Sequence, residues 1–131
     1  RGKILYLCGN YPIILPGLDG RVNWRIGIRR ALTVHQVQTI LTDADEPLIL
    51  FEHDRTLYDD NADLLPHIGD LCRHKAAETG TVVLFATRPD RWLARIEPYA
   101  HRMIFMIEPS STVRPALSKS PSVQRRIHQI W

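Results

Sequence analysis

The stretch EPLILFEHDRTLYDD, residues 46–60, decides the fold that we expect for this chain. Its residues 47–51 form an apolar run that is too short for a helix and too continuous for a strand with one face in water. Such a run is typical of a strand that is buried on both faces, as in a parallel sheet. Acidic residues begin where this strand ends. Glu52, His53 and Asp54 are therefore expected at the carboxyl edge of the sheet, where open α/β sheets bind their ligands.

Outward from this stretch, strands and helices alternate along the chain. Short apolar segments predict further strands at residues 3–7, 22–28, 81–86 and 103–107. Apolar residues at helical spacing predict three helices, whose N-caps would be Thr33, Asp63 and Asp90 and whose ends would be Asp43, Gly80 and Tyr99. This alternation predicts right-handed crossovers and a mainly parallel sheet. We therefore expect a three-layer α/β/α sandwich in a core domain of residues 1–109.

The C-terminal part of the chain has a different composition. Residues 110–121 are rich in Ser, Pro and Thr, which predicts a linker. Residues 122–131 are expected to form a helical arm, because apolar residues recur there at helical spacing. Three uses of this arm stay open: docking on its own domain, binding a partner or a second copy of the chain, or contacting nucleic acid through Arg125, Arg126 and Trp131. A purely structural interaction module that acts through the arm is one of the functions to consider.

The overall composition is typical of a soluble globular protein. The chain has 131 residues, of which 44% are hydrophobic and 24% charged, and its length is that of one domain. A net charge of +3 is compatible with a nucleic-acid partner but does not require one. No apolar run approaches the roughly 18 residues of a membrane span, so we expect no contact with a membrane. Cys8 and Cys72 have no metal-binding spacing, which favours two buried thiols in a reducing cytoplasm.

Two kinds of chemistry fit the acidic turn at residues 52–54. A carboxylate that directly follows a buried strand can hold a magnesium ion through water against nucleotide phosphates. Glu52 and Asp54 would then be the metal-binding residues of a nucleotide-binding fold. In a phosphatase, the residue after the strand is instead a nucleophilic carboxylate, and a carboxylate two residues later acts as general acid and base. The same two residues stand at these positions. A turn that is merely well capped is the third interpretation.

A second group of polar residues surrounds the start of the first predicted helix. Arg29 and Arg30 precede the N-cap Thr33, and His35 and Gln36 follow it. All four are candidate contacts to phosphate or to a neighbouring subunit. Solvated charges at the end of a strand are the alternative interpretation of the two arginines.

The wider layout resembles the core of RecA-like recombinases, the archaeal RadA and RadB group, over about residues 3–108. KILYLCGN resembles the strand after the P-loop helix, LILFEHDRTLYDD the Walker B strand, and TVVLFATRPD and RMIFM the two strands that follow. RIGIRRALTVHQVQTIL resembles the segment that carries an arginine and a Gln-containing helix. The resemblance implies a P-loop NTPase topology, with Glu52, His53 and Asp54 as a Walker-B-like turn and Thr87 and Arg88 at a sensor-like strand end.

The phosphate-binding loop of that family is missing from this sequence. No G-x-x-x-x-G-K-[ST] occurs in it, and Glu52 stands where the family usually has Asp. Either the loop preceded Arg1, or the chain is a degenerate copy that keeps the fold and has lost hydrolysis. The second alternative follows from the sequence as given. We therefore expect a non-hydrolysing accessory or regulatory protein. The resemblance alone implies a role in DNA recombination or repair. It also implies single-stranded DNA or a recombination protein as the partner, and magnesium and ATP as the cofactors.

The segment FEHDRTLYDD is also similar to the D-x-D-x-T-L loop of haloacid-dehalogenase-type phosphatases. Asp54, Thr56 and Leu57 match this loop, and Thr87 lies where those enzymes have their second Ser or Thr. Glu52 departs from the nucleophilic Asp, because its side chain is one methylene longer. This resemblance implies a magnesium-dependent phosphatase as the alternative function.

Overall fold

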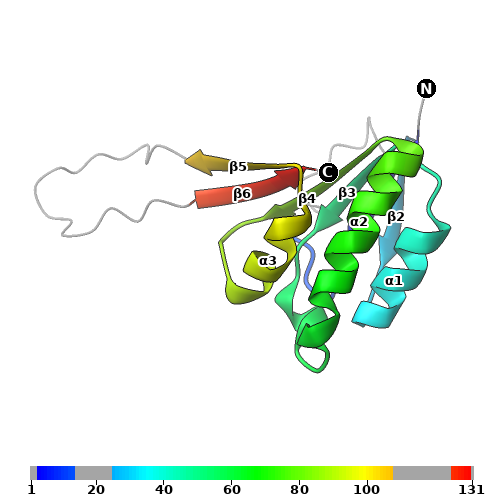
Figure 1. Cartoon of the computed structure of the whole chain (residues 1–131). Coiled ribbons are helices and arrows are strands. Elements are labelled where there is room, and N and C mark those ends of the chain that lie inside the picture. Colours follow the sequence, from blue (N-terminus) through cyan, green and yellow to red (C-terminus); the bar gives the residue numbers. More distant parts are fainter. Residues whose placement is uncertain (1–2, 14–24, 108–124, 131) are drawn as a thin grey trace, which may run out of the picture.

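The computed structural model describes residues 3–13, 25–107 and 125–130, and these form one six-stranded sheet with helices packed against it (Figure 1). Four adjacent strands pair with one another in parallel: β1 (Ile4–Cys8), β2 (Ile26–Arg30), β3 (Leu48–Glu52) and β4 (Thr81–Ala86). The sheet is completed by β5 (Arg102–Ile107) and β6 (Arg125–Ile130), of which β6 runs antiparallel between β4 and β5. The order of the described strands is β2-β1-β3-β4-β6-β5, so the parallel part has the order 2-1-3-4.

The central strands of the sheet are the apolar runs of the sequence. β1, β3 and β4 each lie between two other strands, and Leu7, Ile49, Phe51 and Val82 from these strands are fully buried. Phe51 lies in register between Leu7 of β1 and Leu84 of β4. β2 lies at one edge of the described sheet, and its side chains are mostly exposed. The buried strand predicted at residues 47–51 is therefore confirmed, with its bounds one residue further along the chain.

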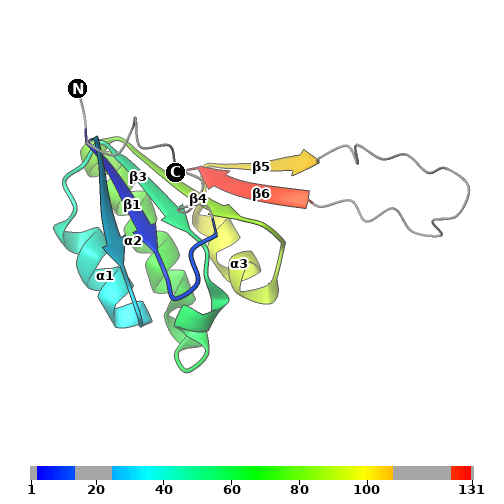
Figure 2. The same ribbon diagram turned by 180° about the vertical axis from the view of Figure 1, so that it is seen from behind.

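Three α-helices among the described residues cover one face of the sheet (Figures 1 and 2). They are α1 (Val34–Asp43), α2 (Leu65–Thr79) and α3 (Arg91–Ile96). The helices lead from β2 to β3, from β3 to β4 and from β4 to β5, so each connection moves across the sheet in the same direction. Right-handed crossovers that move in one direction all place their helices on the same face of the sheet. The step from β1 to β2 runs the other way, and residues 14–24 of that connection lie outside the described part. The described residues thus form two layers, whereas we expected three.

Most of the expected helix boundaries are confirmed. Thr33 caps α1 by accepting a hydrogen bond from the backbone N–H of Gln36, and Asp90 caps α3. Gly80 ends α2 with a φ of 147°, a conformation that favours glycine. The predicted cap Asp63 is wrong, because residues Ala62–Leu64 form a separate 3₁₀ turn and α2 begins after it at Leu65. None of the helices among the described residues is long and apolar enough to cross a membrane.

The helical arm predicted for residues 122–131 is wrong, because residues Arg125–Ile130 form strand β6. The apolar residues Ile127 and Ile130 fit a helical spacing, but β6 fills the position between β4 and β5 and pairs with both. The linker predicted at residues 110–121, and Trp131, lie outside the described residues. The strand predicted at residues 22–28 is also shifted, since β2 begins at Ile26 and extends to Arg30.

Candidate functional site

The carboxyl ends of β1, β3 and β4 meet at one edge of the sheet and bring three loops together. The chain leaves β1 towards β2 on one side, and it returns across β1 to form β3 on the other side. In open α/β sheets, ligands bind at such a switch point, outside the carboxyl ends of the strands. Residues 9–13 follow β1, residues 53–56 follow β3, and residues 87–90 follow β4. These loops form the candidate site.

Glu52, the first residue of the acidic turn, is buried and fully engaged by the protein. Its side chain is on the face of the sheet opposite the helices, and the residue is 4% exposed. The Tyr6 hydroxyl donates a hydrogen bond to one carboxylate oxygen, and the backbone N–H of Ile13 donates to the other at 2.6 Å. Glu52 therefore joins β1 and the loop that follows it to the end of β3.

Asp54 makes a second connection to the same loop. Its Oδ1 accepts hydrogen bonds from the backbone N–H and the hydroxyl of Thr56, at 3.0 and 2.6 Å, and its Oδ2 accepts from the backbone N–H of Tyr11 at 3.0 Å. Asn10 also contributes, because its side-chain amide donates to the Thr56 hydroxyl at 3.0 Å. Burial by itself would raise the pKa of Asp54, but the hydrogen bonds from Thr56 and the backbone outweigh it and lower the pKa.

His53 points towards the loop after β4 and pairs with Asp90. The His53 Nε2 and the Asp90 Oδ2 lie 2.8 Å apart, while the Asp90 Oδ1 accepts from the backbone N–H of Leu93 at 2.7 Å. Burial would raise the pKa of Asp90, but the hydrogen bonds from His53 and Leu93 lower it below its usual value. The His53 ring also stacks on Tyr58, with ring centroids 6.0 Å apart.

Two buried polar atoms at this pair have no hydrogen-bond partner within the part of the chain that the structure describes. They are the His53 Nδ1 and the Tyr58 hydroxyl oxygen. Burial raises the pKa of Tyr58 far above its usual value, so the phenol stays neutral. When Nε2 carries the proton that is donated to Asp90, Nδ1 is an unprotonated acceptor. This nitrogen is closed off from solvent.

A cavity of about 490 Å³ lies between the three loops. Tyr11 and Ile13 line it from the loop after β1, and Arg88 lines it from the loop after β4. The turn after β3 contributes the residues from His53 to Thr56, which include the exposed Arg55. The loop after β4 adds Thr87 and the Asp90 carboxylate. The cavity is therefore bounded by apolar and aromatic groups on one loop and by charged groups on the other two.

The structure brings together part of the site that the sequence predicts. His53 and Asp54, from the predicted acidic turn, line the same cavity as Thr87 and Arg88, from the predicted strand end. Glu52 lies directly behind them, below the loop after β1. The position of these residues at the carboxyl ends of adjacent strands explains why a sequence pattern could find them.

The other predicted contacts lie away from this cavity. Arg29 and Arg30 end β2, and His35 and Gln36 lie in the first turns of α1; none of the four lines it. The Gln36 side chain instead accepts a hydrogen bond from the backbone N–H of Leu32 at 2.6 Å, so it stabilises the start of α1. Of the proposed arm, the backbone of Arg125 and Arg126 lies in β6, and Trp131 lies outside the described residues.

Sequence reasoning missed three residues that shape the cavity. Tyr11 lies in a segment that predicts only an irregular loop, and Arg55 directly follows the acidic turn at residues 52–54, whose carboxylates were the candidates for chemistry. Asp90 was predicted only as a helix cap, although it also pairs with His53 across 37 positions in the sequence. An N-cap aspartate next to a strand end is a signal that could have suggested this second role.

The expected magnesium site at Glu52 and Asp54 does not fit this arrangement. Each of the four carboxylate oxygens accepts a hydrogen bond from the protein. Among the described residues, no group of three or more His, Cys, Asp or Glu side chains could hold a metal ion. The two carboxylates instead connect the end of β3 and its turn to β1 and to the loop after β1.

Comparisons with known proteins found a sequence relative and a solved structure with a similar fold. No protein-family model matches the chain. An uncharacterized protein from Archaeoglobus fulgidus is 36% identical over 107 residues, which are 81% of this chain and 54% of the relative, so the chain spans about half the length of that protein. A solved structure described as a putative methyltransferase from Thermoplasma acidophilum superposes with a TM-score of 0.50 and 7% identity, covering 98% of this chain and 66% of that one.

The resemblance to RecA-like recombinases that we expected from the sequence is wrong. The structural similarity is to a putative methyltransferase, and the parallel strands have the order 2-1-3-4 of a Rossmann-like, methyltransferase-type fold. The weaker resemblance to haloacid-dehalogenase-type phosphatases is corrected by the same finding. Short segments such as LILFEHDRTLYDD suggested these families because a buried strand followed by an acid occurs in many α/β folds. The link to DNA recombination came from the first resemblance and is not supported.

Proposed function

We propose that this chain is a non-hydrolysing accessory or regulatory domain that binds a small polar molecule in the cavity at the carboxyl edge of its sheet. The observation that carries the proposal is the engagement of both carboxylates in the acidic turn. Glu52 accepts hydrogen bonds from the Tyr6 hydroxyl and the backbone N–H of Ile13. Asp54 accepts hydrogen bonds from Thr56 and from the backbone N–H of Tyr11. These bonds shape the wall of a cavity and leave neither residue free as a nucleophile.

The location and size of the cavity support a binding function. It lies where the direction of the chain across the sheet reverses, which is the usual ligand position in this class of fold. Its volume of about 490 Å³ is within the range of about 300–1,000 Å³ that is typical of small-molecule sites. The loop after β1 is held in place by Asp54 and Glu52, so one wall is preorganised before any ligand arrives.

Hydrolysis is not favoured by the same geometry. A nucleophilic carboxylate needs an oxygen that can reach the substrate, and both oxygens of Glu52 are already bound in a buried position. The sequence also lacks the glycine-rich loop and lysine that hold nucleotide triphosphates. A magnesium-dependent phosphatase is the alternative function, and an activity assay distinguishes it from the proposed one.

Methyl transfer is a second candidate, which comes from the description of the solved structure with the same fold. The sequence contains no G-x-G-x-x-G after β1, and a likeness at the level of the fold carries no activity with it. A methyl donor such as S-adenosylmethionine is nevertheless small enough to be one of the molecules to test. Binding to single-stranded DNA and self-association stay predictions.

The proposal is tested by locating ligands and by measuring hydrolysis on the same protein. We expect a panel of small polar molecules, which includes S-adenosylmethionine, to contain at least one that shifts amide NMR signals of residues 53–56 and 86–90. The signals of α1 and β2 serve as the internal control. We also expect no magnesium-dependent phosphate release from ATP or from p-nitrophenyl phosphate. Phosphate release that disappears in Asp54→Asn, or ligand shifts that are confined to other surfaces, would contradict the proposal.

A further inference from the structure

We infer that the ligand of this cavity is a phosphate ester of nucleotide size, a nucleoside monophosphate, whose phosphate contacts Arg55 and Arg88 and whose base contacts Tyr11. This inference rests on the proposed function and names the class of molecule that the cavity takes. It follows from which polar groups of the lining are already satisfied, from the position of its apolar groups and from its volume.

The acceptors that line the cavity are already engaged. Asp54 accepts three hydrogen bonds, from Thr56 and from the backbone of Tyr11. Both carboxylate oxygens of Asp90 are also occupied, one by His53 and one by the backbone N–H of Leu93. A ligand that offers mainly donors would find few free acceptors in these side chains. These engaged acceptors favour a ligand that can itself accept hydrogen bonds over one that offers only donors.

The two arginines of the lining are available to a ligand, in contrast to its carboxylates. Arg55 and Arg88 are exposed, line the cavity from two different loops, and have no hydrogen-bond or ion-pair partner among the described residues. The exposed hydroxyl-bearing Thr87 lies next to Arg88 in the same wall. Guanidinium groups match the geometry of phosphate oxygens and bind them bidentately. Two of them around one cavity favour a dianionic group over a single carboxylate.

The opposite side of the cavity is apolar and aromatic. Tyr11 is 70% exposed and Ile13 is 60% exposed, although both side chains are large and apolar in part. Their backbone N–H groups are held by Asp54 and Glu52, so the loop presents both side chains in a defined position. An exposed aromatic ring in a cavity that also contains arginine side chains is suited to stack on a nucleobase. The two walls together fit a molecule with a planar base at one end and a phosphate at the other.

The lining of the cavity also indicates how many phosphate groups the nucleotide carries. The cavity of about 490 Å³ has the size of a small-molecule site. The sequence contains no G-x-x-x-x-G-K-[ST], the loop that holds the triphosphate in P-loop NTPases. Two arginines are sufficient for one terminal phosphate. The lining therefore fits a monophosphate better than a di- or triphosphate.

The experiment compares AMP, adenosine and inorganic phosphate by calorimetric titration, with amide NMR to locate each of them. We expect AMP to bind best and to shift the signals of residues 53–56 and 86–90. Arg55→Gln and Arg88→Gln should each weaken AMP binding by about tenfold, the typical loss of a charge-assisted hydrogen bond. Tyr11→Ala should weaken AMP and leave inorganic phosphate unchanged. Arg29→Gln, which removes the same charge at the end of β2 outside the cavity, is the matched control and should have no effect.

The outcomes separate this inference from the function on which it rests. If adenosine binds as tightly as AMP, or if Arg29→Gln weakens AMP as much as Arg88→Gln does, the phosphate assignment is overturned. If a molecule without phosphate shifts the cavity signals and AMP does not, the ligand class is wrong but the binding function stands. If no molecule shifts those signals, both proposals fail together.

Discussion

At position 9, a side chain of any size would collide with the carboxylate of Asp54. A Cβ atom added to Gly9 would lie 2.6 Å from the Asp54 Oδ2 and 2.7 Å from its Cβ, closer than real contacts allow. Gly9 is buried at the end of β1, where the Asp54 carboxylate also binds the backbone of Tyr11. The glycine is therefore needed for a close approach of two loops, since its φ is not positive.

Gly9→Ala should destabilise the fold for this reason. We expect a loss of about 1–3 kcal/mol in the free energy of unfolding, typical of an overpacked site, because the methyl group displaces the Asp54 carboxylate from its donors. Urea denaturation measures this loss. Gly27→Ala is the matched control, since its Cβ would meet only the Ile4 carbonyl oxygen, at 4.0 Å. Equal effects of the two substitutions would show that Gly9 is not tightly packed against Asp54.

The Asp54 carboxylate should make stability depend on pH. Its pKa in the folded protein is below the ordinary value of 3.8, so the fold favours the charged form. Its contribution is then complete above that ordinary value and is lost as the pH falls through the lower, folded pKa. Asp54→Asn should destabilise the protein near neutral pH by about 1–3 kcal/mol, because an amide cannot accept at both oxygen positions. The difference from the wild type should shrink in urea titrations below about pH 4. A difference that is constant with pH would contradict this role for Asp54.

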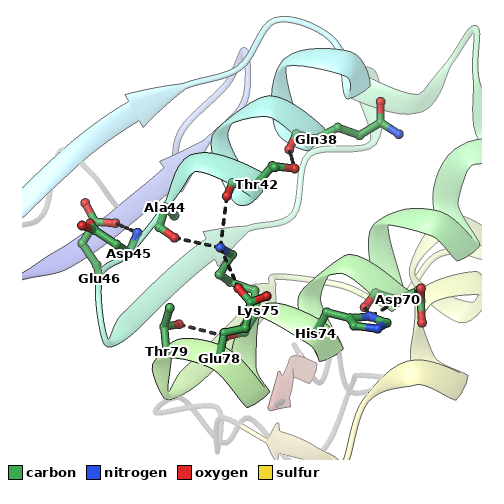
Figure 3. A network of polar contacts seen from close by, with 10 residues as sticks. All are labelled: Gln38, Thr42, Ala44, Asp45, Glu46, Asp70, His74, Lys75, Glu78 and Thr79. Atoms are coloured by element: carbon green, nitrogen blue, oxygen red, sulfur yellow. Dashed lines mark hydrogen bonds and ion pairs between the residues drawn. The ribbon is translucent and has the colours of Figure 1, made fainter.

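At the scale of elements, a buried lysine joins the helices α1 and α2, as Figure 3 shows. The Nζ of Lys75 in α2 donates to the carbonyl oxygens of Thr42 and Ala44, at 3.1 and 2.9 Å. Carbonyl groups at the end of a helix have no partner within it, so Lys75 satisfies two such groups at the end of α1. The lysine also forms an ion pair with Glu78 at 3.2 Å, on the exposed side of α2.

Lys75→Met tests this connection, because methionine keeps the length of the side chain and loses the donors. We expect a loss of about 1–3 kcal/mol in the free energy of unfolding, since two carbonyl groups in a buried environment lose their partner. Glu78→Gln, which removes only the exposed ion pair, should cost less than about 1 kcal/mol. Chemical denaturation of the two variants gives the comparison. If Glu78→Gln were the more harmful of the two, the ion pair and not the helix connection would be the main contribution of Lys75.

At the scale of the whole molecule, stability should decrease from the centre of the sheet to its edges. β1, β3 and β4 have a strand on each side and carry most of the fully buried residues of the sheet, whereas β2 pairs only with β1 among the described residues. Local opening is easiest where few apolar contacts must be broken. We therefore expect the amide hydrogens of β1, β3 and β4 to exchange most slowly with solvent, and those of β2 at least about tenfold faster.

Native-state hydrogen exchange followed by NMR measures this gradient strand by strand. Gly27 and Ile28 in β2 can be compared directly with Leu5 and Tyr6, their partners in β1. Exchange of β2 as slow as that of β3 would mean that the edge of the described sheet is covered in solution. A second copy of the chain would be one such cover, and the dependence of the exchange rates on protein concentration would reveal it.

Local chemistry in the sequence determined most of the elements and the place of the candidate site. The apolar runs at β1, β3 and β4, the caps Thr33 and Asp90, and the stop at Gly80 act within a few residues of where they lie. Because strand ends follow from these patterns, the sequence also determined that Glu52, His53 and Asp54 lie at the carboxyl edge of the sheet. Their neighbours Thr87 and Arg88 could be placed there for the same reason.

The tertiary structure alone decided what those residues do there. The pairing of Asp54 with the backbone of Tyr11, of Glu52 with Tyr6 and of His53 with Asp90 joins positions that are between 37 and 46 residues apart. No local pattern shows that these contacts occupy the carboxylates, while Arg55 and Arg88 have no partner among the described residues. Residues Arg125–Ile130 are strand β6 for the same physical reason: their apolar spacing also fits a helix, and only the open position between β4 and β5 selects the extended conformation.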